Sequence, residues 1–328
     1  MAWPTEEWRE SALDSRVDRA KLAALLDEAF GSALGATHGL LIAQRGAIVS
    51  ERYAPDFGSA ATHISWSMAK SVLQGVVGIL VREGRLDLRA PIGAPEWSEP
   101  GDPRRALTLD VLLRMSSGLR FAEDYADRGV SDVIEMLFGS GQKDVAAYAA
   151  ARPLDHAPDT VWNYSSGTSN LVARETLRAV GSGPADCGAF LARELFEPLG
   201  IRSARLRFDQ AGTWIGSSFL YATARDFARF GLLYLRDGVW DGQRILPAGW
   251  VDYARTPTPG SGGAYGAHWW IVPGSLGIFQ AQGYSGQRTT LVPALDLVIV
   301  RLGNTPAELS PAFEGFMKRL VDLFRPTR

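Results

Sequence analysis

Apolar and polar residues alternate in short runs near both ends of the chain, a pattern typical of half-buried β-strands. Near the start, apolar runs at 39–43 and 47–50 flank the polar turn 44–46, and this arrangement predicts a β-hairpin. Apolar residues at helical spacing predict an amphipathic helix near each end, over 18–34 and over 311–324. The other strand patterns follow one another late in the chain, at 268–272, 277–281, 288–292 and 297–302.

Between these strand-rich ends the spacing of apolar residues is helical. Residues 66–84 are apolar almost all round a helical wheel, so this helix should be buried on most faces, with Ser65 as its N-cap. A short helix is predicted over 107–119, capped near Thr108 and ended at Gly118. Further helices are predicted near 131–138, 144–151, 167–180, 187–198 and 223–236, with loops at 121–129, 139–143 and 152–166.

These patterns predict an α+β fold in which both chain ends build one antiparallel sheet, flanked by the terminal helices, with an all-helical domain inserted between them. We place the sheet domain at residues 1–75 and 211–328 and the helical domain at 76–210. Because ligand pockets favour domain interfaces, we expect the active site at the junction.

Composition narrows the class of protein. A chain of 328 residues with 46% hydrophobic and 21% charged residues is ordinary for a globular enzyme of one or two domains. The net charge of -2 argues against binding to nucleic acid or a membrane surface through bulk electrostatics. The single cysteine, Cys187, excludes an intrachain disulfide framework and a Cys-rich zinc site. Neither a signal peptide nor a membrane-spanning run is predicted, so we expect a cytoplasmic protein.

Ser67 and Lys70 are three residues apart at the start of the predicted 66–84 helix, so they share one face of its first turn. Burial lowers the pKa of a lysine, and a neutral amine beside a hydroxyl is a base beside a nucleophile. Only four of the 34 basic residues are lysines, which indicates that this position needs an amine, because arginine does not deprotonate. The alternative is that Lys70 extends to solvent and Ser67 only caps the helix. A second Ser-x-x-Lys, from Ser140 to Lys143, lies between glycines and is interpreted as a solvated loop.

Two other segments carry groups that an acylated serine would need. Tyr164 precedes a predicted helix, and a phenol near a lysine ammonium should have a lowered pKa and could move a proton. A core tyrosine with a satisfied hydroxyl is the alternative. The segment 283–287, Gly-Tyr-Ser-Gly-Gln, lies between two strand patterns, and its glycines allow another group to approach the backbone closely. A backbone N–H group from it could join that of Ser67 in an oxyanion hole.

Taken together, Ser67-Met68-Ala69-Lys70, Tyr164-Ser165-Ser166 and Tyr284-Ser285-Gly286 resemble the three motifs of the serine β-lactamase and penicillin-binding-protein superfamily in order and spacing. The segments 112–119 and 221–231 resemble conserved blocks of its class C branch. The first and third motifs are most similar to those of 6-aminohexanoate-dimer (nylon-oligomer) hydrolases and related esterases. The resemblance extends over residues 35–325 and implies a β-lactamase/transpeptidase-like fold.

The resemblance implies a role for each residue. Ser67 would be the acylated nucleophile, Lys70 its base and Tyr164 the proton relay. The backbone N–H groups of Ser67 and Gln287 would form the oxyanion hole. Tyr125 would help to hold the substrate amide. The other substrate-binding residues that it implies are Ser166, Tyr284, Ser285 and Gly286. No cofactor or metal is expected, the partner is a small ester or amide, and a homodimer is left open.

Two substitutions within the motifs favour esters or linear amides over β-lactams. Tyr284 replaces the lysine that recognises a carboxylate in the family, and Ser166 replaces a frequent asparagine. A β-lactamase or D-Ala-D-Ala peptidase, and a sensor or scaffold that is acylated without turnover, remain alternatives. An α/β-hydrolase using Ser285 is excluded because no histidine follows it; the last is His268. The four histidines show no His-Glu-x-x-His pattern, so a metallohydrolase has no support.

Overall fold

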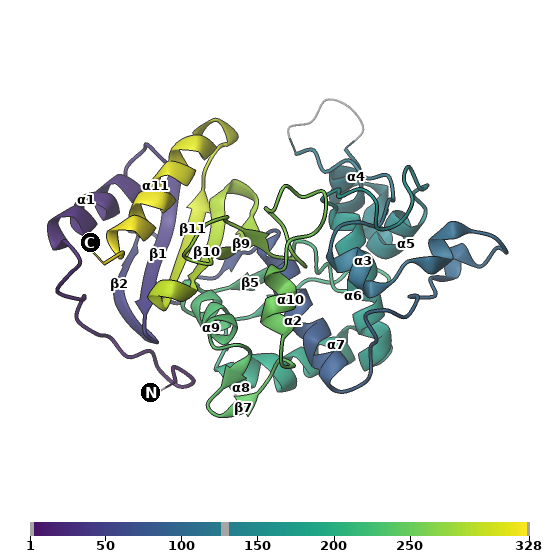
Figure 1. Ribbon diagram of the computed structural model, residues 1–328, viewed down its shortest axis with the longest axis horizontal. Helices are drawn as coiled ribbons and strands as arrows, with labels where there is room; N and C mark the ends of the chain where they lie inside the picture. The colour runs from purple at the N-terminus through teal and green to yellow at the C-terminus, as the bar shows by residue number, and fades with distance from the viewer. Residues whose placement is uncertain (1–2, 126–130, 327–328) are drawn as a thin grey trace.

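A six-stranded antiparallel sheet forms one half of the protein, in a computed structural model that describes residues 3–125 and 131–326 (Figure 1). Its strand order is β2-β1-β11-β10-β9-β8, so the hairpin from the start of the chain pairs directly with strands from its end. The α+β fold class predicted from the sequence is therefore confirmed. The strands span Ala36–Gln44 (β1), Ala47–Tyr53 (β2), Trp270–Ile271 (β8), Phe279–Gly283 (β9), Gln287–Val292 (β10) and Leu297–Asn304 (β11).

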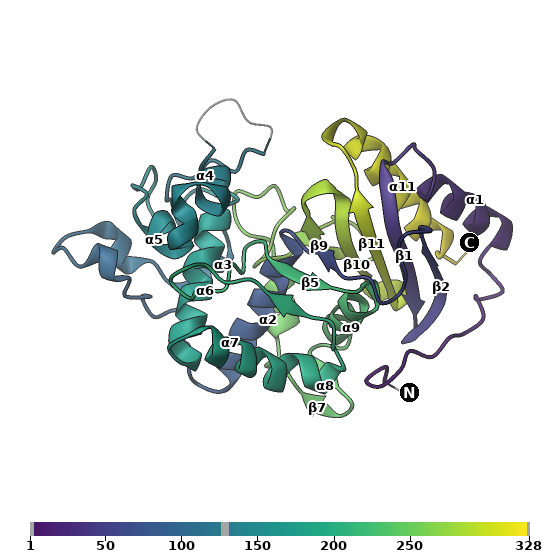
Figure 2. The same ribbon diagram turned by 180° about the vertical axis from the view of Figure 1, so that it is seen from behind.

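Alternate residues of the sheet are buried on opposite faces, as the two-residue period of a strand requires. Leu40 of β1 packs in a cluster with α1 (Arg19–Ala29) and α11 (Ser310–Leu323), the two terminal helices that lie together on one face (Figures 1 and 2). Its neighbour Leu41 packs in the main core on the other face, where α9 (Ala224–Leu235) lies against the sheet. The sheet is thus covered by helices on both sides.

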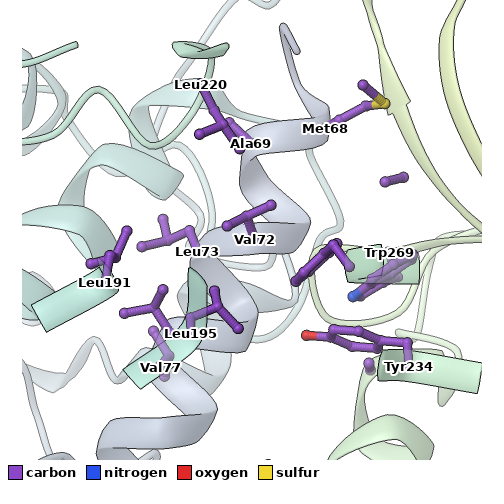
Figure 3. Close-up of a cluster of buried hydrophobic side chains, with 14 of the residues drawn as sticks. Met68, Ala69, Val72, Leu73, Val77, Leu191, Leu195, Leu220, Tyr234 and Trp269 are labelled. Atoms are coloured by element: carbon purple, nitrogen blue, oxygen red, sulfur yellow. The ribbon is translucent and has the colours of Figure 1, made fainter. Parts of the chain in front are cut away.

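Helix α2 (Met68–Arg82) runs through the middle of the molecule, between the sheet and the helical part (Figure 1). Every residue from Met68 to Leu80 is buried, as its apolar wheel predicted. Leu191 lies on one side of α2, and Tyr234 and Trp269 lie on the other (Figure 3). Side chains therefore pack against α2 on both of its sides.

The helical part contains most of the helices expected from the apolar spacing. Among the described residues, five of them lie between residue 109 and residue 191, and a π-helical turn at Ala192–Phe196 continues the last. The Ser140–Lys143 segment is a short 3₁₀ turn at the surface, apart from the buried Gly141. The helices span Leu109–Leu113 (α3), Asp132–Phe138 (α4), Val145–Ala150 (α5), Ser166–Val180 (α6), Pro184–Leu191 (α7) and Glu197–Leu199 (α8).

Several predicted helix boundaries are wrong. The helix expected over 18–34 ends at Ala29. The helix expected over 107–119 is capped by Thr108 but ends at Leu113, because Met115 adopts a left-handed φ of 61°. Ser65 does not cap α2: its backbone N–H donates to the carbonyl of Leu220 at 2.7 Å, and its Oγ accepts from the Leu220 N–H. Ser65 instead ties the approach to α2 to a small sheet.

Several short elements were not predicted, because strands of two or three residues and a helix of six residues are too short to show a clear period. Part of the predicted loop at 121–129 lies outside the described residues. The additional elements are β3 (His63–Ile64), β4 (Arg205–Leu206) and β5 (Leu220–Ala222) in the small sheet, the hairpin β6 (Val239–Trp240) and β7 (Gln243–Arg244), and α10 (Trp250–Arg255).

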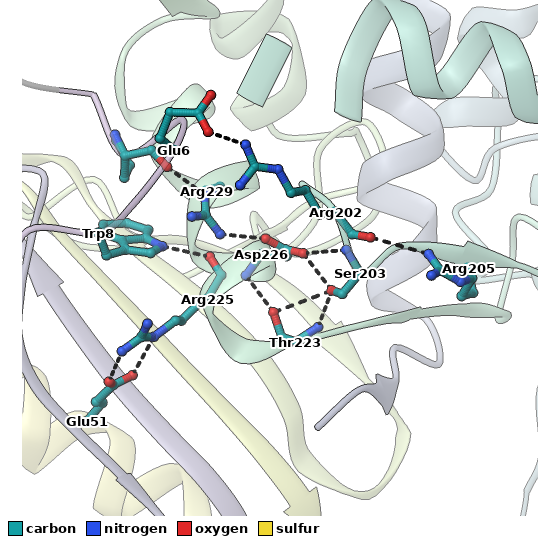
Figure 4. Close-up of polar contacts among 11 residues, drawn as sticks. Glu6, Trp8, Glu51, Arg202, Ser203, Arg205, Thr223, Arg225, Asp226 and Arg229 are labelled. Carbon is teal, nitrogen blue, oxygen red and sulfur yellow. Dashed lines mark hydrogen bonds and ion pairs between the residues drawn. The ribbon is translucent and has the colours of Figure 1, made fainter. Parts of the chain in front are cut away.

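Polar contacts fix α9 and the segment before it against the first residues of the chain (Figure 4). Arg225 forms an ion pair with Glu51 of β2, and its carbonyl accepts from the Trp8 indole at 3.2 Å. One turn later, Arg229 pairs with Asp226 at 2.6 Å, and both side chains are almost fully buried. The Arg225 pair joins the hairpin end of the sheet to α9, and the Arg229 pair lies within that helix.

Within the described ranges, no helix is long and apolar enough to cross a membrane. The domain boundaries near residues 75 and 210, the cytoplasmic location and the homodimer stay predictions.

Candidate active site

Ser67 lies at the N-cap position of α2, where its side chain makes no capping hydrogen bond. The preceding residue, Trp66, has a left-handed φ of 45°, so the chain turns sharply into the helix. Ser67 remains partly exposed, whereas the next residues of the helix are buried. The serine hydroxyl is therefore both accessible and free of a structural role as a helix cap.

Lys70 is 1% exposed, which excludes the alternative that it extends to solvent. Its Nζ lies 3.0 Å from Ser67 Oγ, 2.9 Å from Ser166 Oγ and 2.9 Å from the carbonyl oxygen of Ser217. Burial lowers the pKa of Lys70 to about 8, although the charge of Glu123 opposes this effect. Roughly a tenth of the amine is therefore neutral at pH 7, far more than for an ordinary lysine, and this fraction can accept a proton.

Tyr164 lies just before α6, with its ring over the lysine: Lys70 Nζ is 5.0 Å from the ring centroid. The prediction of a lowered pKa for this phenol is wrong. Burial and the charge of Glu123 raise the pKa of Tyr164, and a hydrogen bond with the Ser67 side chain offsets only part of the rise. Tyr164 consequently keeps its proton at neutral pH and is placed to donate it.

Glu123 belongs to the same cluster and was missed in the sequence analysis. Both its oxygens accept from Ser166, the backbone N–H at 2.7 Å and the Oγ at 2.5 Å. The Tyr125 hydroxyl also donates to Glu123, which raises the pKa of that phenol together with burial. Nothing in the local sequence marks this carboxylate except its place two residues before Tyr125. Ser166 was expected to bind substrate, but in the structure it links Lys70 to Glu123.

The third motif forms a 3₁₀ turn, Tyr284–Gly286, between β9 and β10. Gly283, just before this turn, lies against the entry to α2: a Cβ atom there would be 2.2 Å from the Ser65 carbonyl oxygen and 3.2 Å from Trp66 Cβ. Ser285 has a left-handed φ of 58°, and its carbonyl oxygen accepts from the Thr305 N–H at 2.8 Å. The motif is therefore anchored in the sheet and brought beside the nucleophile by a close backbone approach.

The oxyanion role predicted for Gln287 does not fit this turn. Its backbone N–H donates to the Tyr284 carbonyl, so it is already engaged. Its side chain is paired with the backbone of Gly303 on β11, accepting from the N–H at 3.0 Å and donating to the carbonyl. The backbone oxygens of Ser285 and Gly286 both accept from the buried Arg301 at 3.2 Å. These contacts make the turn rigid.

Aromatic rings stand on two sides of the nucleophile. On one side, Tyr284 is 44% exposed and its ring centroid lies 4.8 Å from that of Tyr125 and 6.0 Å from that of Trp66. On the other side, the Tyr164 ring lies 5.3 Å from Trp270. Trp270 was not singled out in the sequence analysis. Such rings offer flat apolar surface to a substrate.

Within residues 3–125 and 131–326, no group of three or more histidine, cysteine, aspartate and glutamate side chains is arranged to hold a metal ion. Histidine is a residue type that often binds metals, but His268 is buried against the backbone of Lys70. Its Nδ1 lies 3.1 Å from the Lys70 carbonyl oxygen and its Nε2 lies 3.1 Å from Ser169 Oγ. Burial and the nearby Lys70 charge lower the pKa of His268 to about 3, so it is a neutral support for the helix backbone.

Comparison with known proteins identifies related chains. A family model described as beta-lactamase matches residues 27–322. The 6-aminohexanoate-dimer hydrolase of Paenarthrobacter ureafaciens is 26% identical over 291 residues, which are 82% of this chain and 73% of that protein.

Solved structures share the fold. One described as a putative 6-aminohexanoate-dimer hydrolase from Bacillus anthracis has a TM-score of 0.79 and 20% identity, over 96% of this chain and 87% of that chain. A D-stereospecific amidohydrolase from Streptomyces sp. has a TM-score of 0.66 and 17% identity, over 87% of this chain and 96% of that chain. The β-lactamase/transpeptidase-like fold expected from the sequence is confirmed.

Proposed function

The chain belongs to the beta-lactamase family, and on that premise we propose that it is a serine hydrolase that cleaves esters or linear amides through an acyl-enzyme. The observation that carries the proposal is the 3.0 Å contact between Ser67 Oγ and the Nζ of a fully buried lysine. A buried lysine is costly unless it is neutral or paired, and a neutral amine beside a hydroxyl is a base beside a nucleophile. The names of the relatives, a 6-aminohexanoate-dimer hydrolase and an amidohydrolase, agree with this class of reaction.

In the proposed acylation step, neutral Lys70 takes the proton of Ser67 while Oγ attacks the carbonyl carbon of the substrate. The bond to the leaving group then breaks, and the leaving atom receives the phenolic proton of Tyr164, which its raised pKa keeps in place. The Lys70 ammonium returns a proton to Tyr164. In the second half, water attacks the ester of Ser67, loses its proton to the same groups and restores the free hydroxyl.

We assign the developing oxyanion to the backbone N–H groups of Ser67 and Tyr284. Gln287 is replaced in this role because its N–H is engaged within the turn. Tyr284 follows Gly283, whose backbone approaches the entry to α2, and we therefore assign the second donor to its N–H. Each such donor stabilises a transition state by roughly 2.7–4 kcal/mol.

The surroundings of the site favour a substrate without a carboxylate beside the scissile bond. Tyr284 presents a phenol where the family usually presents a lysine. The rings of Tyr125 and Trp66 contact it and extend the aromatic surface. A carboxylate desolvated there without a partner would cost several kcal/mol. β-Lactams carry such a carboxylate, whereas simple esters and many linear amides do not.

The proposal is tested by assaying p-nitrophenyl esters of increasing acyl length, the linear dimer of 6-aminohexanoate and the cephalosporin nitrocefin. We expect steady turnover of the esters, abolished in Ser67→Ala, and little turnover of nitrocefin. A burst of p-nitrophenol without later turnover would identify an acylated sensor instead. Equal activity of wild type and Ser67→Ala on every substrate would refute the proposal.

A further inference from the structure

Among the described residues, Glu123 is the carboxylate hydrogen-bonded within the catalytic cluster, and the proposed acylation chemistry assigns it no step. We propose that Glu123 is a positioning residue that acts through Ser166 to direct the lone pair of Lys70 toward Ser67. This inference rests on the proposed function, because it concerns the base of that reaction.

The hydrogen bonds of Glu123 fix the proton of Ser166. Three donors converge on the carboxylate: the Ser166 N–H, the Ser166 Oγ–H and the Tyr125 hydroxyl. An ionised carboxylate is an acceptor only, so it matches three donors. Ser166 has one hydroxyl proton, and Glu123 takes it at 2.5 Å. In its 2.9 Å contact with Lys70 Nζ, the Ser166 oxygen must therefore accept.

This direction determines where the lone pair of neutral Lys70 lies. A neutral amine has two N–H donors and one lone pair. One N–H goes to the Ser217 carbonyl oxygen, which can only accept, and the other goes to Ser166. The third neighbour is Ser67 Oγ at 3.0 Å, so the lone pair faces its hydroxyl proton. Without Glu123, Ser166 could donate its own proton to the lone pair and block it.

The proton can move from Ser67 to Lys70 without a change in the other hydrogen bonds of the lysine. The O–H bond of Ser67 breaks as its oxygen attacks the substrate, and a third N–H bond forms on Lys70. The resulting ammonium has three donors and the same three acceptors, Ser67, Ser166 and Ser217. The negative charge of Glu123, which raises the pKa of Lys70, also stabilises the ammonium formed in this step.

The other titratable groups around the lysine stay neutral across the working pH range. The imidazole of His268 has a pKa of about 3, and burial raises the pKa of each nearby phenol well above its ordinary value. Those phenols belong to Tyr125, Tyr164 and Tyr265. Glu123 is thus the charged partner whose removal should change the titration of Lys70.

The experiment uses Glu123→Gln, which keeps the shape, removes the charge and supplies an amide that can donate to Ser166. Its matched control is Glu135→Gln, because Glu135 also accepts from a serine N–H and Oγ, those of Ser140, at the surface of the helical part. Lys70 Nζ is titrated by NMR with lysine labelled at the ε-carbon. The chain has four lysines, and Lys70→Arg assigns the signal. This readout requires no turnover.

In Glu123→Gln we expect the titration midpoint of the Lys70 amine to fall by about half a pH unit or more. We also expect kcat on a p-nitrophenyl ester to fall at least about tenfold. Glu135→Gln should match wild type in both. A fall in kcat with an unmoved midpoint would reduce Glu123 to a structural role, and wild-type values in both would overturn the proposal. If the wild type turns over no ester but the midpoint still moves, the proposed function fails while the link from Glu123 to Lys70 stands.

A second variant covers the outcome in which Glu123→Gln does not fold. Glu123→Asp keeps the charge but shortens the reach to Ser166. We expect its Lys70 midpoint to stay within a few tenths of a pH unit of wild type while kcat falls about tenfold. Retention of the wild-type kcat in Glu123→Asp would contradict the proposal, because the hydrogen bond that fixes the Ser166 proton would then be dispensable.

Discussion

The backbone of Gly283 lies so close to Ser65 that a Cβ atom at position 283 would be 2.2 Å from the Ser65 carbonyl oxygen. This contact joins the end of β9 to the turn that leads into the nucleophile helix. The two residues come from opposite ends of the chain, and their contact sets the position of the third motif relative to Ser67. Any side chain at position 283 must push the sheet and the helix apart.

Gly283→Ala should therefore impair catalysis more than folding. Overpacking of this kind typically costs about 1–3 kcal/mol, and the displaced backbone donor would lower kcat by an order of magnitude or more. Thermal unfolding and ester hydrolysis measure the two effects. Gly58→Ala is the control, because a Cβ there meets nothing within 4 Å and Gly58 has no left-handed φ. Wild-type kcat in Gly283→Ala would show that the approach is not needed.

The pH dependence of kcat/KM should reflect the titration of Lys70. Below its pKa of about 8 the amine is protonated and cannot accept the proton of Ser67, so activity should rise with pH through a midpoint near 8. The Tyr164 phenol, whose pKa is raised, keeps its proton over this range and should produce no second limb near neutrality. The rate of ester hydrolysis without enzyme is subtracted at each pH. A corrected kcat/KM that falls from pH 7 to pH 9 would contradict a lysine base, which must lose its proton to act.

Tyr164→Phe removes one oxygen atom and leaves the ring, which packs against Trp270. Because the phenol is proposed to protonate the leaving group, the loss should be larger for amides and for esters of poor leaving groups than for p-nitrophenyl esters. We expect a fall of about two orders of magnitude on the former. Equal losses on good and poor leaving groups would assign Tyr164 to another step.

Tyr284→Lys restores the cation of the family motif at an exposed position of the turn. If the phenol explains the preference against β-lactams, this variant should hydrolyse nitrocefin faster than wild type by about tenfold. Its activity on an uncharged ester should change much less. A wild-type enzyme that already hydrolyses nitrocefin as well as its best ester would make this residue irrelevant to selectivity.

The local chemistry was predictable from the sequence where it depends on helix geometry. The spacing of Ser67 and Lys70 places them on one turn of α2, and the nearly continuous apolar wheel predicts the burial that lowers the lysine pKa. The hairpin near the start and the strands near the end could likewise be predicted from their two-residue period.

Features that depend on distant contacts were not predictable. Glu123 reaches Ser166 across 43 residues from a loop without periodicity. Burial, together with the charge of Glu123, reverses the expected direction of the Tyr164 pKa shift. The hydrogen bond that engages the Gln287 N–H follows from the left-handed φ of Ser285, a conformation unusual for a residue other than glycine. Sequence spacing carries no information on either contact.

The most direct test of the account is the pre-steady-state release of p-nitrophenol from an activated ester, with mass detection of the acylated protein and of its proteolytic peptides. Wild type should show a burst and an added acyl mass on the peptide that contains Ser67. Lys143→Arg, which alters the other Ser-x-x-Lys segment, should behave as wild type, whereas Lys70→Arg should lose several orders of magnitude in the burst rate because arginine cannot become a neutral base. A burst in Lys70→Arg at more than about a tenth of the wild-type rate would contradict the account.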